Sequence, residues 1–262
     1  MPARPRPLGP VLAFAHRGGA AHPDLLGLEN TLAAFQHAWD LGYTHLETDV
    51  HATADGVLLA FHDAVLDRVT DRTGRVDRTP YDVVRQARVG GREPVPTFAA
   101  LLHALPGATF NVDLKSARAG ALLADLLDAE QAWDRVLVGS FSITRTAAFR
   151  RRTRGRVRTA ATPPEAAAFR MLPSGRLARL LTRGRVAAVQ VPRRRGPLTV
   201  VTPGLVRRAH AAGVPVHVWT VDDPDEMRTL LDLGVDGLFT DRTDVLRDVL
   251  HERGAWPTGA VR

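Results

Sequence analysis

Eight short apolar runs divide this chain, and segments with helical spacing lie between most of them. Such alternation is typical of repeated βα units and argues against a β-sandwich. Eight units favour a closed TIM (β/α)8 barrel, although no internal sequence repeat supports the count, so a doubly wound open sheet is the competing architecture. We predict strands at residues 11–15, 45–50, 110–115, 136–140, 157–161, 186–191, 215–220 and 236–240.

One helix between these runs is clear from its spacing. Leu32, Phe35 and Trp39 recur at helical intervals and a glycine follows as a stop signal, which predicts a helix over residues 31–41. The chain has 262 residues, of which 45% are hydrophobic, and this is enough to bury one large core. We therefore predict a single α/β domain over residues 1–262.

A β-hairpin is predicted directly after the second strand. Asp55-Gly56 separates two β-like runs, and Asp-Gly is a strong signal for a two-residue turn. Counting outward from that turn places Asp49 opposite His62. Alternate side chains of a strand share a face, so Glu47 points the same way as Asp49. Local geometry alone therefore predicts that these three side chains converge.

The segment from residue 64 to residue 109 contains no clear βα unit. Glycines and the sequence Pro94-Val95-Pro96 interrupt it, so we expect a small insertion above the barrel after the second-strand hairpin. Such an insertion either caps a site at the barrel mouth or is a loop and helix without functional consequence.

The charge of the chain is positive and unevenly distributed. The formal net charge is +7 and the isoelectric point is near 11.0, which suits an anionic partner such as nucleic acid, a lipid surface or a phosphorylated small molecule. Residues 145–158 and residues 176–195 each carry seven arginines and no acid. These stretches are either a phosphate or membrane-surface patch or solvated surface in an arginine-biased chain, and we favour the second interpretation.

No segment points to export or to a stable membrane anchor. The absence of cysteine fits a reducing compartment. The basic start at residues 1–7 is followed by an apolar stretch that ends at His16, too short for a signal peptide or a membrane helix. We expect a cytoplasmic protein that makes at most transient contact with lipid surfaces, and the sequence leaves its oligomeric state open.

Chemically reactive side chains gather at or near the ends of the predicted strands. Lys115 is the only lysine of the chain, and both asparagines belong to the same clusters. A barrel collects the carboxyl ends of its strands at one mouth, so this set predicts metal-assisted phosphoester chemistry there. The clusters are His16-Arg17-Gly18, Glu29-Asn30, Glu47-Thr48-Asp49, His62-Asp63 and Asn111-Val112-Asp113-Leu114-Lys115.

Three acids of these clusters are candidates for binding a cation. Asp113 and Lys115 are two residues apart and share a face of their strand, as Glu47 and Asp49 do on theirs. Three carboxylates that face one volume repel one another unless a metal ion, or Arg17 together with Lys115, balances their charge. Oxygen ligands without thiols select a hard ion, Mg²⁺ or Ca²⁺. The alternative is an internal salt-bridge network with Lys115, which would contribute little to stability by itself.

The order and spacing of these motifs resemble the glycerophosphodiester phosphodiesterase family. The resemblance extends to Thr53-x-Asp55-Gly56 and, near the end of the chain, to Val218-Trp219-Thr220-Val221, Gly234-Val235-Asp236-Gly237 and Thr240-Asp241. It implies a phospholipase C-like phosphodiesterase barrel with a small insertion. It also implies metal-dependent hydrolysis of glycerophosphodiesters to glycerol 3-phosphate and an alcohol, as a step of glycerol and lipid metabolism.

The resemblance implies a role for each matching residue. Glu47, Asp49 and Asp113 would be the metal ligands, and His16 and His62 would be the acid and base of catalysis. The sequence does not tell which histidine is the acid and which is the base.

Four further residues have implied roles at the substrate. Arg17 and Lys115 would bind the phosphate, and Trp219 would lie beside the glycerol moiety, unless it only fills the barrel mouth. Glu29 would either touch the metal or orient His16 and Arg17.

Two positions depart from the family pattern. Asp113 stands where glutamate is most common, and its side chain is one methylene shorter, so it must move closer to the ion or bind it through water. Leu28 occupies the usual proline position before Glu29, which loosens the loop without removing a chemical group.

Two other classes of function are open at this point. A related barrel phosphodiesterase that acts on lysophospholipids or other lipid headgroups would share the catalytic residues and differ in the 64–109 segment. A non-enzymatic anion or nucleic-acid binder would use the arginine stretches, but these lack stacking aromatics apart from Phe149. Such a binder would also leave the acidic cluster unexplained. We therefore expect a small-molecule substrate and no nucleic-acid partner.

Overall fold

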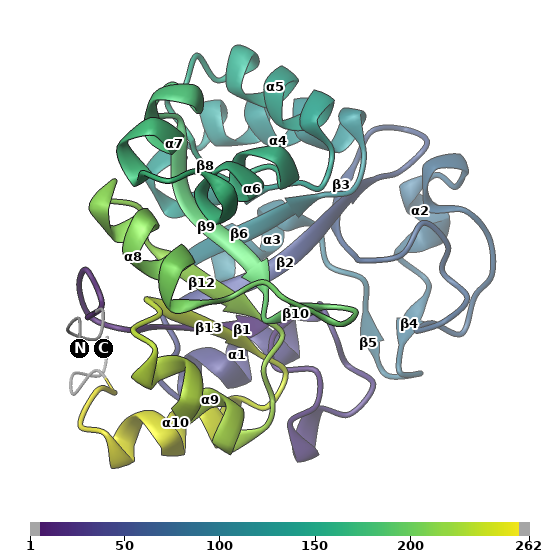
Figure 1. Ribbon diagram of the computed structural model, residues 1–262. Helices are drawn as coiled ribbons and strands as arrows, with labels where there is room; N and C mark the ends of the chain where they lie inside the picture. The colour runs from purple at the N-terminus through teal and green to yellow at the C-terminus, as the bar shows by residue number, and fades with distance from the viewer. Residues whose placement is uncertain (1–5, 257–262) are drawn as a thin grey trace.

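The computed structural model describes residues 6–256 and shows a barrel of eight parallel strands surrounded by helices (Figure 1). β1 pairs with β2 on one side and with β13 on the other, which closes the barrel. The predicted TIM barrel is therefore confirmed, and the open sheet is wrong. The barrel strands are β1 (Leu12–His16), β2 (His45–Ala52), β6 (Thr109–Leu114), β7 (Val136–Gly139), β8 (Arg158–Ala160), β9 (Val186–Pro192), β12 (Val216–Trp219) and β13 (Gly237–Thr240).

Each predicted strand is present, with ends within two residues of those expected. The layer between the strands and the surrounding helices is filled by buried apolar side chains such as Leu46, Phe110 and Val216. Phe110 packs there against Phe35 and Phe98 of two of these helices. Residues 1–5 of the basic start lie outside the described residues.

Helices form the outer layer and return the chain between strands (Figure 1). Several begin at a side chain that accepts a backbone N–H of the first turn, as Thr31 does from Ala34 and Ser116 does from Ala119. The predicted first helix is confirmed with Thr31 as its cap. The helices are α1 (Leu32–Asp40), α2 (Tyr81–Val84), α3 (Phe98–Ala104), α4 (Ala117–Ala129), α5 (Ile143–Arg152), α6 (Pro163–Met171), α7 (Gly175–Leu181), α8 (Pro203–Ala211), α9 (Pro224–Asp232) and α10 (Thr243–Glu252).

The hairpin after β2 is present, but its predicted register is wrong by one residue. β3 (Leu58–Ala60) pairs antiparallel with β2 so that Val50 faces Ala60, and the N–H of Phe61 donates to the carbonyl of Asp49 (2.9 Å). Phe61 and not His62 is therefore the neighbour of Asp49. The turn has three central residues because Gly56 adopts a positive φ of 91° and its N–H bonds back to the carbonyl of Thr53.

The segment 64–109 forms the expected insertion, which we call the excursion. It contains α2, α3 and a short ribbon of β4 (Arg88–Val89) and β5 (Glu93–Pro94). Its apolar residues, among them Leu66, Val84 and Val95, form a small core with Leu59 and Phe61 of the hairpin. In Figure 1, α2 and the β4–β5 ribbon stand at one side of the barrel.

The two arginine stretches differ in their surroundings. In residues 145–158, Arg150 pairs with Glu165, Arg152 with Asp125 and Arg156 with Asp128, so this stretch fits the interpretation as solvated, charge-balanced surface. The second stretch includes all of α7 but its first residue, and also β10 (Arg194–Arg195), which pairs with β11 (Leu198–Thr199) just beyond it. No described helix has the length and apolar character needed to cross a lipid bilayer. The expected cytoplasmic location stays a prediction.

Candidate active site

The carboxyl ends of β1, β2 and β6 bring four of the predicted site residues together. His16 on β1 pairs in register with Glu47 on β2, and Asp49 on β2 pairs with Asp113 on β6. Side chains two residues apart on β2 share a face, so both acids of this strand point to the same side. The parallel register of β1, β2 and β6 therefore brings these residues together as the sequence pattern predicted, and it does so without a contribution from the hairpin.

Lys115 lies between two of the acids. Its Nζ atom is 2.8 Å from Oδ1 of Asp49 and 2.8 Å from Oδ2 of Asp113. Burial alone would raise the pKa of Asp49, but Lys115 and then Arg17 hold it below its usual value. Burial keeps the pKa of Asp113 above its usual value although Lys115 opposes that effect. The single ammonium of Lys115 lies between the two carboxylates of Asp49 and Asp113, so it does not neutralise both. These two acids therefore attract a further cation.

Glu47 is buried, and the ring of His16, which would be positively charged when protonated, is too far from its carboxylate for a hydrogen bond. Its Oε2 atom accepts the backbone N–H of Arg17 (3.2 Å) and lies 3.7 Å from Nε2 of His16. Burial, together with the neighbouring Asp49, raises the pKa of Glu47 to about 8. A divalent cation would oppose both effects by stabilising the ionised carboxylate. The oxygen-only donor set of the buried Glu47 and Asp49 and the half-buried Asp113 therefore fits a hard cation.

The carboxylate oxygens of Glu47, Asp49 and Asp113 do not all lie within 4.8 Å of one another. Among residues 6–256, only His22, Asp24 and His37 form a group of three or more histidine or acidic side chains whose ligand atoms all lie within 4.8 Å of one another. The carboxylate oxygens of the three acids are thus more widely spaced, as the short side chain of Asp113 leads one to expect.

The His22 group is poorly prepared to bind a metal. Nδ1 of His22 already accepts the backbone N–H of Asp24 (3.2 Å), and Nδ1 of His37 is buried without a hydrogen-bond partner. A metal-binding histidine usually donates its second ring N–H to an acceptor. The strand-end acids are therefore the better candidates.

His16 is held between two carboxylates. Its Nδ1 atom is 2.8 Å from Oδ1 of Asp241, which follows β13, while Nε2 faces Glu47. Burial would lower the pKa of His16, but Glu47 and Asp241 raise it above its ordinary value. Asp241 is itself fixed because its backbone N–H donates to Asp222 (2.8 Å). The imidazole of His16 is therefore oriented with Nε2 toward the acids.

His62 has a carboxylate partner of its own. Its Nδ1 atom lies 2.5 Å from Oδ1 of Asp63, and Nε of Arg68 donates to Oδ2 of Asp63 (2.6 Å). Arg68 also donates through Nη1 and Nη2 to Glu29 (2.8 and 2.7 Å), which accepts Nη1 of Arg17 on its other side (3.1 Å). Because Arg68 belongs to the excursion, this insertion contributes directly to the surroundings of His62 and Glu29.

The loop between β1 and α1 is tied to β2 by an asparagine. Arg17 and Asn30 both adopt positive φ, 50° and 58°, and the N–H of Asn30 donates to the carbonyl of Arg17 (2.9 Å). The Asn30 side chain accepts the hydroxyl of Thr48 (2.7 Å) and donates to Asp49 (3.3 Å). Strained backbone persists only where the surroundings fix it, as these bonds do. They hold Arg17 and Glu29 over the acids.

Trp219 ends β12 and is half-buried. Its ring meets the ring of Phe141 edge-on, with centroids 5.7 Å apart, and Phe141 is 66% exposed. The two aromatics form an apolar rim at the carboxyl ends of β7 and β12.

Sequence reasoning missed three residues of this arrangement. Asp241 and Asp63 stand in motifs that the sequence analysis quoted, but no role was predicted for either. Their signal is the histidine, because a catalytic imidazole is often oriented by a carboxylate. Arg68 carries no such signal, since only the folded excursion brings it to Glu29 and Asp63.

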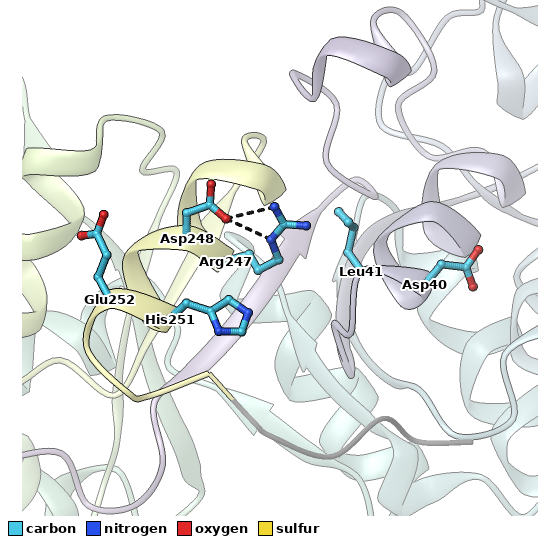
Figure 2. Close-up of a pocket in the computed structure, with 6 residues that line it drawn as sticks. All are labelled: Asp40, Leu41, Arg247, Asp248, His251 and Glu252. Atoms are coloured by element: carbon cyan, nitrogen blue, oxygen red, sulfur yellow. Dashed lines mark hydrogen bonds and ion pairs between the residues drawn. The ribbon is translucent and has the colours of Figure 1, made fainter.

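A separate hollow of about 570 Å³ lies at the other end of the barrel from these residues. Figure 2 shows its lining side chains from the ends of α1 and α10, with Arg247 bonded to Asp248. The helices run opposite to the strands, so their carboxyl ends lie at the end of the barrel away from the strand ends that carry the site. Its arginine is already paired, and it brings none of the predicted site residues together.

Comparison with known proteins gives consistent matches. Residues 16–245 match the model of the Glycerophosphoryl diester phosphodiesterase family. The chain is 42% identical over 251 residues to a probable glycerophosphodiester phosphodiesterase 2 of Mycobacterium tuberculosis, covering 95% of this chain and 94% of that protein. It is 26% identical to a glycerophosphodiester phosphodiesterase of Caldanaerobacter subterraneus, covering 93% and 99% respectively.

Solved structures with this fold are also similar. A glycerophosphodiester phosphodiesterase from Agrobacterium tumefaciens superposes with a TM-score of 0.74 at 25% identity, covering 90% of this chain and 98% of that one. A phosphodiesterase from Oleispira antarctica, solved in complex with the product sn-glycerol-3-phosphate, has a TM-score of 0.76 at 23% identity, covering 92% and 97%. At this identity the second structure supports the fold alone.

Proposed function

The chain belongs to the glycerophosphoryl diester phosphodiesterase family, and on that basis we propose that it hydrolyses glycerophosphodiesters to glycerol 3-phosphate and an alcohol. The resemblance read from the sequence is thus confirmed, and the protein is a phosphoric diester hydrolase. One observation carries the proposed chemistry. Two carboxylate-oriented histidines flank a buried acidic cluster that also contains an arginine and the only lysine.

Glu47, Asp49 and Asp113 would hold a divalent cation, Mg²⁺ or Ca²⁺. When bound, such an ion stabilises the charge that develops on phosphate oxygens. The burial of Glu47 and Asp49, the oxygen-only donor set and the raised pKa of Glu47 support this assignment. Glu29 is proposed to orient Arg17, because it accepts hydrogen bonds from both Arg17 and Arg68.

Arg17 and Lys115 would bind the non-bridging phosphate oxygens. The Nε atom of Arg17 is buried without a hydrogen-bond partner and lies 3.4 Å from Oδ2 of Asp49. Lys115 keeps three rotatable donors near the same acids. Both cations are therefore close to the acids and able to share the charge of a phosphate that enters there.

His16 and His62 would carry the protons. One takes the proton of the nucleophile, and the other gives a proton to the leaving alcohol oxygen as the P–O bond breaks. Each ring uses Nδ1 for its carboxylate, which leaves Nε2 for the substrate. We propose that the substrate's own glycerol hydroxyl attacks phosphorus, which gives a cyclic phosphate, and that water then opens the ring to glycerol 3-phosphate.

Release of glycerol 3-phosphate tests this function directly. Purified protein is incubated with several glycerophosphodiesters that differ in their alcohol, and glycerol 3-phosphate and free alcohol are measured in the same samples. Equimolar release of both products is expected. Absence of glycerol 3-phosphate from every glycerophosphodiester would exclude the proposed activity.

A second candidate function is cleavage of lysophospholipids or similar lipid headgroups. The exposed Phe141 beside Trp219, with the exposed Ile143 two residues further along the chain, provides an apolar rim that an acyl chain could contact. The same assay with a lysophospholipid distinguishes the two candidates. A higher kcat/KM for the lysophospholipid than for every water-soluble glycerophosphodiester would favour the second.

Lys115→Met is expected to lower turnover by about 10²-fold, the size of the loss when one charge-stabilising donor is removed. The thermal midpoint should also fall, because Asp49 and Asp113 then face each other without their shared ammonium. Lys115→Arg should restore turnover only in part, since a planar guanidinium does not replace a compact ammonium. Turnover and midpoint are measured on the same preparations. A large midpoint drop with near-normal turnover would contradict a phosphate role.

Asp113→Asn is expected to weaken binding of Mg²⁺ or Ca²⁺ by about 10-fold or more, because it removes one anionic ligand. Asp113→Glu is the matched control, and it should bind the ion at least as tightly as the natural residue because its carboxylate reaches farther. Calorimetric titration of the ion measures both. Wild-type affinity in Asp113→Asn would remove position 113 from the ligand set.

Arg68→Met is expected to lower kcat about 10-fold while changing KM little, because Asp63 loses the two bonds that fix it beside His62. Arg72→Met is the matched control, because Arg72 is an exposed arginine of the same segment whose side chain bonds to Gln86 and not to the site. Steady-state kinetics on a water-soluble substrate measures both. Equal kinetics of the two variants would show that the excursion does not support His62.

A further inference from the structure

Helix α7 turns its small residues toward the protein and its large apolar residues toward the surface, which is the reverse of an ordinary surface helix. It buries the small residues Gly175 and Ala178 and exposes Leu177 (38%), Leu180 (72%) and Leu181 (62%). A surface helix normally turns its large apolar side chains inward, because their burial stabilises the fold. The exposed leucines are therefore available to a partner rather than to the core of this chain.

The orientation of α7 is fixed by close contacts with α8. A Cβ atom at Gly175 would lie 1.8 Å from the carbonyl oxygen of Arg208, so only glycine permits this approach. Nη1 of Arg179 donates to the carbonyl of Ala212 just after α8 (2.8 Å). The helix cannot rotate to bury its leucines without losing these contacts. Met171, at the end of α6, adds a fourth exposed apolar side chain (79%).

The surroundings of these apolar side chains are basic. The sequence contains no acid between Glu165 and Asp222, a segment that holds ten arginines and includes the end of α6 and all of α7 and α8. Three exposed members, Arg176, Arg183 and Arg185, have no side-chain hydrogen bond or ion pair within residues 6–256. This contrasts with the paired arginines of residues 145–158.

We propose that this surface, defined by Met171, Leu177, Leu180 and Leu181 with Arg176, Arg183 and Arg185, docks on an anionic lipid membrane. We call it the α7 face. Exposed aliphatic side chains among unpaired cations are the combination that binds the interface of anionic bilayers. The proposal goes beyond the hydrolytic function and does not depend on it.

The charge and the side-chain types of the α7 face favour an anionic lipid surface over a second copy of the chain or a nucleic acid. A second copy of the chain packed on the same face by a two-fold axis would bring like charges together. Single-stranded nucleic acid is bound by stacking on aromatic side chains, and the α7 face has none. Duplex nucleic acid is bound through its phosphates by basic side chains and would leave the exposed leucines without a partner. An anionic bilayer satisfies both the arginines and the leucines.

The location of the α7 face leaves the site accessible. In Figure 1, α7 lies in the outer layer between α6 and α8, on the side of the barrel away from α2 and the β4–β5 ribbon. A membrane bound there would contact the barrel wall, and the strand ends would stay open to water-soluble substrate.

Co-sedimentation of the full chain with vesicles tests the proposal. We expect partition onto mixed phosphatidylcholine and phosphatidylglycerol vesicles to exceed partition onto pure phosphatidylcholine at least ten-fold, and to fall as NaCl rises from about 50 to about 500 mM. Leu180→Ser/Leu181→Ser and Arg183→Glu/Arg185→Glu should each lower it at least ten-fold. Val83→Ser/Arg78→Glu, an exposed pair in the excursion, is the matched control and should bind as the natural chain does.

Two results would overturn the proposal. One is equal partition onto neutral and anionic vesicles, or none onto either. The other is a dimer in sedimentation equilibrium that Leu180→Ser/Leu181→Ser converts to monomer while neither form binds vesicles. Hydrolysis of a water-soluble substrate, measured without vesicles, should be the same in all these variants. A failure of docking is thereby distinguished from a failure of the proposed function.

Discussion

Excess chelator is expected to lower hydrolysis by at least about 10³-fold, because a cation that stabilises phosphate charge contributes several kcal/mol to the transition state. Added Mg²⁺ or Ca²⁺ should restore activity, since the candidate ligands Glu47, Asp49 and Asp113 offer only oxygen. Without an ion, Glu47 is buried beside another acid, and its pKa of about 8 reflects that situation. Initial rates of glycerol 3-phosphate release across a titration of each ion measure the effect.

The His22 group supplies the control for this experiment. Histidine-containing clusters prefer softer ions than Mg²⁺ or Ca²⁺. His37→Ala should therefore show the same chelator sensitivity and the same Mg²⁺ or Ca²⁺ titration as the natural chain. Full activity in excess chelator would show that the acids are balanced by Lys115 and Arg17 alone, as in the salt-bridge alternative.

The eight barrel strands were predictable because each leaves a local trace, an apolar run bounded by turns. The meeting of four candidate site residues was predictable for the same reason, since His16, Glu47, Asp49 and Asp113 lie on strands whose parallel register brings their ends level. The hairpin register was not predictable from Asp55-Gly56 alone. The Thr53 hydroxyl bonds to Asp55 (2.6 Å) and the N–H of Tyr81 in the excursion bonds to the same carboxylate, so a distant segment shapes the turn.

The residues that hold the two histidines could not be predicted from the sequence, for a similar reason. Asp241 stands 225 residues from His16 and meets it only because the barrel closes between β1 and β13. Arg68 reaches Glu29 across 39 residues because the excursion folds back against the loop between β1 and α1. Composition and spacing describe single segments, whereas these contacts depend on the whole fold.

Removing the imidazole of either His16 or His62 by substitution with alanine is expected to lower kcat by about 10²–10⁴-fold, the range for losing a positioned proton carrier. Each ring is held by a carboxylate through Nδ1, so each presents Nε2 in a defined direction. Steady-state kinetics with a water-soluble glycerophosphodiester measures both variants. The thermal midpoint confirms that the loss is not due to unfolding.

The pH profile and the double variant make this prediction specific to proton transfer. An acid and a base that act together give a bell-shaped profile, and each single variant should lose one limb of it. The double variant should lose much less than the product of the two single losses, because removing one partner already disables the pair. His103→Ala, an exposed histidine paired with Glu130 on the outer layer, is the matched control and should retain normal turnover. Wild-type turnover in His16→Ala or His62→Ala would exclude that histidine from the chemistry, and a retained bell-shaped profile would assign its role to structure instead.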